Sequence, residues 1–129
     1  LDVLKVERID HGVRCVEDPA LVQRLAREGM ALTVCPLSNV KLCVFNDLRS
    51  HNLKSLLNQG VKVTINSDDP AYFGGYLNQN LLETAQALEL TPQDAYTLAR
   101  NSFEASFASA AEKAEWIKRL DQTFERFAA

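Results

Sequence analysis

The sequence predicts an α/β fold with a parallel sheet. Three apolar runs of strand length alternate with segments whose apolar residues recur at helical spacing, and the last third of the chain is helical by the same pattern. Strands that alternate with helices pair in parallel through right-handed crossovers. The length of 129 residues suits about one domain, and no linker divides it, so residues 1–129 are expected to form a single segment.

The first unit is expected to begin with the tail of a helix over residues 1–5 and a short strand over residues 6–12, which runs into a turn at a glycine. A helix over residues 19–28 follows. Asp18 is a favourable residue for the helix start, the proline after it fits the first helical position, and Gly29 suits the helix end.

The second and third strands are expected over residues 31–35 and 61–66. The apolar run at 31–35 does not alternate with polar residues, which is typical of a strand buried on both faces. Between the two strands we expect a loop over residues 36–46 and then a helix that starts at Asp47 or Ser50.

Helices are expected to make up the rest of the chain, over residues 77–88, from Pro92 to about Phe107, and over residues 110–127 with Ser109 as its cap. The last of these helices carries an apolar stripe. Packing within the fold explains the stripe most simply, and an oligomer contact is the alternative. The stripe consists of Trp116, Ile117, Leu120 and Phe124.

The composition excludes several classes of protein. Lys and Arg number 14 against 17 Asp and Glu, so the net charge of −3 argues against a nucleic-acid partner. No apolar run approaches the length of a membrane span, and we expect no membrane association. The three cysteines are odd in number and contain no C-x-x-C pair, which argues against a disulfide framework and a cysteine zinc site and suits the cytoplasm.

Polar residues follow each predicted strand. Asp10 and His11 end the first, Cys35 ends the second, and Asp68 and Asp69 follow the third. Because ligands bind at the carboxyl ends of parallel strands, these side chains are expected to share one rim. Two adjacent carboxylates repel each other unless a cation or hydrogen-bond donors compensate, and a metal ion is the simplest compensator.

Simpler roles remain open for the same residues. His11 precedes a glycine and suits a turn, while the Asp-Asp-Pro sequence at residues 68–70 suits a turn and a helix cap. His51 lies among polar residues at an expected helix start, so we expect a solvated surface histidine there.

Three motifs carry a resemblance to a known family. They are Glu-Arg-Ile-Asp-His-Gly at 7–12, Thr-Val-Cys-Pro-Leu-Ser-Asn at 33–39 and Asn-Ser-Asp-Asp-Pro at 66–70. Together they resemble the adenosine/adenine deaminase family of zinc-dependent (β/α)8 barrels. The resemblance implies that this chain is the C-terminal part of a TIM-type barrel, with its last three βα units and terminal helices.

The details resemble the adenine deaminase branch, notably residues 35–45 and 70–76. Asp10 stands where adenosine deaminases usually carry glycine, and its larger, charged side chain is hypothesised to close the space that a ribose would occupy. The resemblance implies hydrolysis of adenine to hypoxanthine and ammonia by attack of a zinc-bound hydroxide on C6. The alternatives are adenosine as the substrate, or a non-catalytic βα module with a binding or structural role.

Roles follow from the resemblance at three positions. Asp68 matches the carboxylate ligand of the zinc, His11 matches the catalytic histidine beside the zinc-bound water, and Asp69 matches the residue that hydrogen-bonds the purine substrate. The remaining zinc ligands and the proton-donating glutamate of the family lie in motifs that these 129 residues do not contain. We therefore expect the remainder of the barrel as a partner of this segment, and a homo-oligomer stays open. The segment alone is expected neither to bind zinc tightly nor to deaminate purines.

Overall fold

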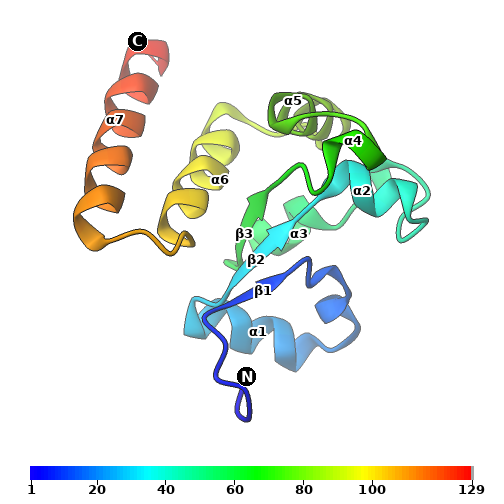
Figure 1. Cartoon of the computed structure of the whole chain (residues 1–129). Coiled ribbons are helices and arrows are strands. Elements are labelled where there is room, and N and C mark those ends of the chain that lie inside the picture. Colours follow the sequence, from blue (N-terminus) through cyan, green and yellow to red (C-terminus); the bar gives the residue numbers. More distant parts are fainter. Residues whose placement is uncertain (129) are drawn as a thin grey trace.

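The computed structural model describes residues 1–128, without the side chain of residue 128, and shows a three-stranded sheet with helices around it (Figure 1). The strands are β1 (Arg8–Asp10), β2 (Ala31–Val34) and β3 (Lys62–Ile65). They pair in the order β1-β2-β3, and both pairs are parallel. The predicted α/β class and parallel sheet are confirmed, although β1 and β3 are shorter than the sequence suggested.

One face of the sheet forms the core. Leu32 pairs in register with Ile9 on one side and Val63 on the other, so these side chains share a face. The same face packs against α1 (Pro19–Glu28), α3 (Leu53–Asn58) and α6 (Pro92–Glu104), which contribute Leu25, Leu56 and Leu98. These three leucines are almost completely buried, and each contributes about 2 kcal/mol relative to an exposed position.

The opposite face of the sheet is polar near the strand ends. Asp10, Thr33 and Thr64 lie in one register row across the three strands, so their side chains point to the face away from the apolar core. A polar inner face suits a sheet that borders a pocket. It supplies fixed polar groups close to the strand ends, where the candidate site residues follow.

The α1 helix begins and ends as predicted. The Asp18 carboxylate accepts hydrogen bonds from the backbone N–H groups of Ala20 at 2.9 Å and Leu21 at 3.2 Å. Gly29 follows the helix with φ 66°, a left-handed conformation that glycine adopts without steric cost. These two ends fix the length of the crossover between β1 and β2.

Two expectations in the first half of the chain are wrong. Residues 1–5 form a single turn, in which the Lys5 N–H donates to the Leu1 carbonyl at 2.9 Å, because Lys5 has φ 49° and ends the turn. The expected loop at 36–46 contains a helix, α2 (Pro36–Lys41). Six residues are too few to show helical periodicity, and Pro36 at the first helical position is a weak signal by itself, because proline is also common in turns.

The expected helix start at Asp47 or Ser50 is a 3-10 turn, η2 (Leu48–Ser50), and α3 begins after it. Asp47 and Ser50 form a reciprocal cap, in which the Ser50 N–H donates to the Asp47 carboxylate at 2.8 Å. A second 3-10 turn that the sequence did not predict, η1 (Val13–Glu17), connects β1 to α1.

Three helices after β3 match the prediction closely. They are α5 (Leu77–Leu88), α6, which ends three residues before Phe107, and α7 (Ala110–Ala128). The short helix α4 (Pro70–Phe73) was not among the expected helices. Ser109 caps α7, and its hydroxyl donates to the Glu112 carboxylate at 2.6 Å. The apolar stripe of α7 packs on α6, where Trp116 lies 5.7 Å from Phe103 and Phe124 lies 4.7 Å from Tyr96 between ring centroids.

Among the described residues, no helix is both long enough and apolar enough to cross a bilayer.

Candidate active site

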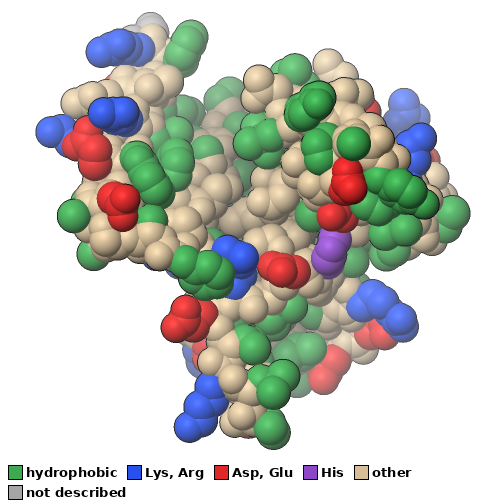
Figure 2. All heavy atoms as spheres, viewed as in Figure 1, with side chains coloured by type: hydrophobic (Ala, Val, Ile, Leu, Met, Phe, Trp, Pro, Cys, Tyr) green, Lys and Arg blue, Asp and Glu red, His purple; other side chains and the backbone are tan. Residues whose placement is uncertain are grey.

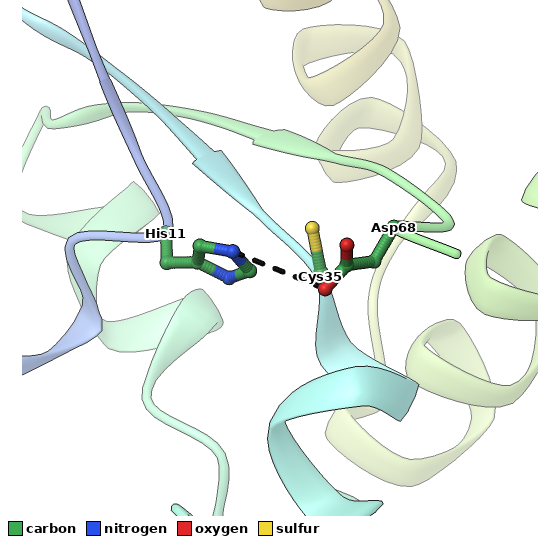
Figure 3. A group of neighbouring side chains, drawn as sticks. All are labelled: His11, Cys35 and Asp68. Atoms are coloured by element: carbon green, nitrogen blue, oxygen red, sulfur yellow. Dashed lines mark ion pairs between the residues drawn. The ribbon is translucent and has the colours of Figure 1, made fainter. Parts of the chain in front are cut away.

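Side chains from the ends of all three strands meet at one edge of the sheet (Figure 3). One donor atom each from His11, Cys35 and Asp68 lies within 4.8 Å of the other two. These residues follow β1, β2 and β3, so the predicted convergence of the strand ends is confirmed. On the space-filled surface, histidine and acidic side chains gather on this same face (Figure 2).

His11 is positioned by an unusual backbone. It has φ 60°, and Gly12 after it has φ 73°, so the chain turns sharply where β1 ends. The His11 N–H still donates to the Thr33 carbonyl at 3.0 Å, which anchors the turn to β2. The His11 ring is 42% exposed and its Nε2 lies 3.9 Å from the Asp68 Oδ2, so the turn aims the imidazole at the carboxylate.

Asp68 is positioned by a serine from α2. The hydroxyl of Ser38 donates to the Asp68 Oδ2 at 2.7 Å, and Ser38 is completely buried. Asp68 itself has φ 57°, so the loop after β3 holds the carboxylate in a strained conformation. This role of Ser38 was not predicted, because α2 itself was not predicted and Ser38 stood out only as a member of the 33–39 motif.

Cys35 forms the third corner of the cluster as a neutral thiol. Its Sγ donates to the Thr33 carbonyl at 3.6 Å. Burial, assisted by the charge of Asp68, raises the pKa of the Cys35 thiol to about 12. The expectation of unpaired cysteines is confirmed, since Cys15 and Cys35 are buried and free and Cys43 is exposed and free.

Asp69 does not join this cluster. Its Oδ1 accepts hydrogen bonds from the backbone N–H groups of Ala71 at 3.0 Å and Tyr72 at 3.1 Å, so it caps α4. The helix-cap alternative is confirmed for Asp69. Within residues 1–128 its Oδ2 has no hydrogen-bond partner, and the predicted contact with a purine stays a prediction.

The cluster lies in an open, polar pocket of about 410 Å³. Asp10 borders it beside His11, and the Thr33 hydroxyl donates to the Asp10 Oδ1 at 2.8 Å. The lining includes Arg8, Asp10, His11, Cys35, Asp68 and Leu77. Carboxylates, an imidazole and one apolar side chain therefore surround a space large enough for a small aromatic molecule.

A family model for adenosine deaminase matches residues 1–123 of the chain. The chain belongs to the adenosine deaminase family. The match covers all three strands and all the residues of the cluster, so the resemblance seen in the three motifs is confirmed.

The chain is similar to adenine deaminases and to an amidohydrolase with bound Zn. Over 121 residues, which make up 94% of this chain, the sequence is 64% identical to an adenine deaminase from Paraburkholderia xenovorans. The crystal structure of an adenine deaminase from Arthrobacter aurescens matches 97% of this chain with a TM-score of 0.94 and 50% identity. An amidohydrolase from Burkholderia ambifaria with bound Zn matches 98% with a TM-score of 0.89 and 25% identity.

The chain spans only part of the length of these relatives. It covers 35% of the Paraburkholderia protein, 38% of the Arthrobacter chain and 36% of the Burkholderia chain. The three parallel strands are therefore consistent with part of an amidohydrolase barrel. Both β1 and β3 are edges of the sheet among the described residues, which is the arrangement that a partial barrel requires.

The carboxylate and imidazole groups at the strand ends of this chain fit part of a zinc site. Zinc in proteins takes carboxylate and imidazole ligands at about 2.0–2.2 Å. Asp68 offers a carboxylate, and the His11 imidazole lies 3.9 Å from it, which is close enough for both to face one ion. A zinc site normally has three or four protein ligands, so the described residues supply a portion of it.

His51 is buried, and its predicted place on the solvated surface is wrong. It is only 4% exposed and its ring lies 4.2 Å from that of Phe45. Nδ1 accepts the Leu53 N–H at 3.1 Å, so Nε2 carries the proton and donates to Asn39 Oδ1 at 3.1 Å. Burial lowers the pKa of His51 to about 4, so a neutral ring connects α2 to α3 outside the pocket.

Proposed function

We propose that this chain forms one side of the active site of a zinc-dependent adenine deaminase, as the C-terminal part of its (β/α)8 barrel. The convergence of His11, Cys35 and Asp68 at one sheet edge carries the proposal. The identity of 64% to an adenine deaminase over 94% of the chain supports adenine as the substrate. A cytoplasmic location, expected from the unpaired cysteines, stays a prediction.

The reaction adds water to C6 of adenine and breaks the bond from C6 to the amino group. Hypoxanthine and ammonia leave, and no oxidant or reductant is required. Zinc, when bound, supplies a Lewis acid that lowers the pKa of water toward neutrality. Asp68 would hold the metal, and the remaining ligands are expected from the rest of the barrel.

The residues of this chain hold protons and orient the reactants. Ser38 occupies Oδ2 of Asp68 with a hydrogen bond, which fixes the plane of the carboxylate and leaves Oδ1 for the metal. His11 Nε2 lies 3.9 Å from Oδ2, so the imidazole is beside the carboxylate, where it is placed to take a proton from the attacking water and to stabilise the oxygen. Asp69 has Oδ2 available to hydrogen-bond the purine, since Oδ1 caps α4.

The partner of this segment in the proposal is the remainder of the barrel. The free edges of β1 and β3 expose unpaired backbone groups, which further strands of a barrel would satisfy. Nothing in the geometry requires a second copy of the chain, and a homo-oligomer stays a prediction.

Assays of the protein that contains this chain, loaded with zinc, test the proposal. Adenine and adenosine are supplied separately, and hypoxanthine, inosine and ammonia are measured. We expect hypoxanthine and ammonia in equal amounts from adenine. Faster conversion of adenosine would change the substrate within the family, and no conversion of either purine by protein with about one zinc per chain would disprove a deaminase.

A further inference from the structure

Asp10 places an anchored carboxylate at the border of the pocket. It is the last residue of β1 and precedes His11 directly. Its Oδ1 accepts the Thr33 hydroxyl at 2.8 Å and lies 3.5 Å from Arg8 Nε. The side chain is nevertheless 72% exposed, so this carboxylate is held in place while it faces solvent in the pocket.

The Arg8 guanidinium also contacts two residues that follow α6. Its guanidinium carbon lies 4.3 Å from the centre of the Phe107 ring, and Nη1 donates to the Ala105 carbonyl at 3.4 Å. The Arg8 side chain is 26% exposed. Arg8 Nε makes no hydrogen bond, so Arg8 acts on Asp10 through its charge, and its guanidinium is poorly placed to reach out and bind a phosphate.

The second oxygen of Asp10 is an acceptor without a partner. Within residues 1–128, Oδ2 makes no hydrogen bond to protein, whereas Oδ1 is occupied by Thr33. A ligand in the pocket that offers an N–H would satisfy this oxygen. A free purine base carries an N–H on its five-membered ring, but a nucleoside carries a sugar carbon on N9 in its place.

We propose that Asp10 selects a free purine base over a nucleoside by accepting a hydrogen bond from the ring N–H. This role rests on the proposed function and concerns its substrate class. A site built to accept a substrate N–H disfavours analogues without it, because the acceptor is then left unpaired against a carbon substituent. A nucleotide is disfavoured further, since its phosphate would bring negative charge toward the Asp10 carboxylate at the border of the pocket.

The test compares adenine with 9-methyladenine, which differs only by a methyl group on N9. The protein that contains this chain is assayed as wild type, Asp10→Ala, Asp10→Asn, Thr33→Val and Glu28→Gln. Glu28 is a matched control because it also pairs with an arginine, Arg24, and lies at the end of α1 before β2 begins, away from the pocket. Binding of both purines to the metal-free protein is measured by calorimetry alongside turnover.

We expect wild type to prefer adenine by about 100-fold in kcat/KM. Asp10→Ala should reduce this preference at least ~10-fold, mainly through weaker use of adenine. Asp10→Asn should retain part of the preference because its amide oxygen still accepts a hydrogen bond. Thr33→Val should fall between wild type and Asp10→Ala, and Glu28→Gln should equal wild type.

Two results would overturn the role of Asp10. One is an equal loss for both purines in Asp10→Ala, in turnover and in binding, which would indicate a structural role. The other is an unchanged preference. The proposed function is decided separately, because it depends on whether wild type converts adenine at all, whereas the binding ratio of the two purines reports on Asp10 even without turnover.

Discussion

A single buried hydroxyl controls the geometry of the Asp68 carboxylate. The Ser38 Oγ lies 2.7 Å from Oδ2, which is the same oxygen that faces His11. Groups that hydrogen-bond a metal ligand fix its orientation, and their loss commonly weakens metal binding by about 10–100-fold. Ser38 is therefore the residue through which α2 acts on the site.

Ser38→Ala should weaken zinc binding by about 10-fold or more in the protein that contains this chain. Competition with a chelator measures the affinity directly, independent of activity. Ser55→Ala is the control, because Ser55 is an exposed serine on α3 that only accepts a hydrogen bond from Gln59. Unchanged zinc affinity in Ser38→Ala, even with lower thermal stability, would contradict the positioning role.

His51 makes stability depend on pH. Its pKa is about 4 in the folded chain, against an ordinary value of 6.5, because the ring is buried as a neutral group. Between these values the unfolded state binds a proton that the folded state excludes, so stability falls as the pH is lowered through this range. The shift corresponds to a loss of about 2 kcal/mol between pH 7 and pH 5.

Urea unfolding at pH 7, 6 and 5 measures this effect, with His51→Gln as the comparison. The variant is expected to be less stable at pH 7, since it disturbs the contacts with Asn39 and Phe45. It should also lose about 2 kcal/mol less than wild type on acidification, because it has no imidazole to protonate. Parallel pH profiles for the two proteins would show that His51 does not cause the dependence.

At the scale of elements, two properties of the turn after β1 favour glycine at position 12, its backbone conformation and the lack of space for a Cβ. Its φ of 73° is costly for any other residue, and a Cβ at this position would lie 2.8 Å from the Leu32 Cδ2. Leu32 is completely buried at the centre of the sheet and cannot move without disturbing the core. The fold therefore requires glycine directly after His11.

Gly12→Ala should destabilise the protein by about 2–4 kcal/mol, from backbone strain plus overpacking. It should also lower activity in the remaining folded protein, because His11 would shift. Gly29→Ala separates the two causes, since Gly29 has φ 66° but no atom within 4 Å of an added Cβ. That control should lose only about 1–2 kcal/mol, and equal losses in the two variants would show that contact with Leu32 does not matter.

Elements with local signals were predictable, and those fixed by tertiary contacts were not. α1 and α6 have strong start signals in Asp18 and Thr91, whose side chains cap them. α2 has a weaker signal, since Pro36 fits its first position but Cys35 precedes it without a side-chain cap. The error at α2 also explains the error at His51, whose burial and hydrogen bond depend on Asn39 of that helix.

The candidate site likewise has a part that the sequence predicts and a part that depends on tertiary contacts. The order of the strands, with the rule that ligands bind at the carboxyl ends of parallel strands, was enough to predict that His11 and Asp68 lie at one edge. The Ser38 contact required α2 to lie beside the loop after β3, which no local pattern encodes. The contrast between Asp68 in the pocket and Asp69 on α4 depends on the positive φ of Asp68, which the Asp-Asp-Pro sequence leaves undetermined.

At the scale of the whole molecule, several surfaces have no partner among the described residues. The strands β1 and β3 are open edges, and an apolar groove of about 480 Å³ lies between α6 and α7. Phe127 at the end of this groove is 87% exposed. Open edges and exposed aromatic groups favour association with other chain segments, so a chain of these residues alone is expected to associate or aggregate.

The isolated 129 residues should therefore neither bind zinc tightly nor deaminate adenine. Asp68 is the one proposed zinc ligand among the described residues, and a zinc site normally takes three or four protein ligands. His51 adds none, because it is turned into the core with both ring nitrogens occupied. The measurement is zinc affinity by chelator competition together with an adenine assay, on the segment and on the longer protein prepared in parallel. Asp68→Asn in both samples shows whether any bound zinc uses the proposed carboxylate. Stoichiometric zinc and hypoxanthine formation by the segment alone would contradict the division of the active site between this chain and the rest of a barrel.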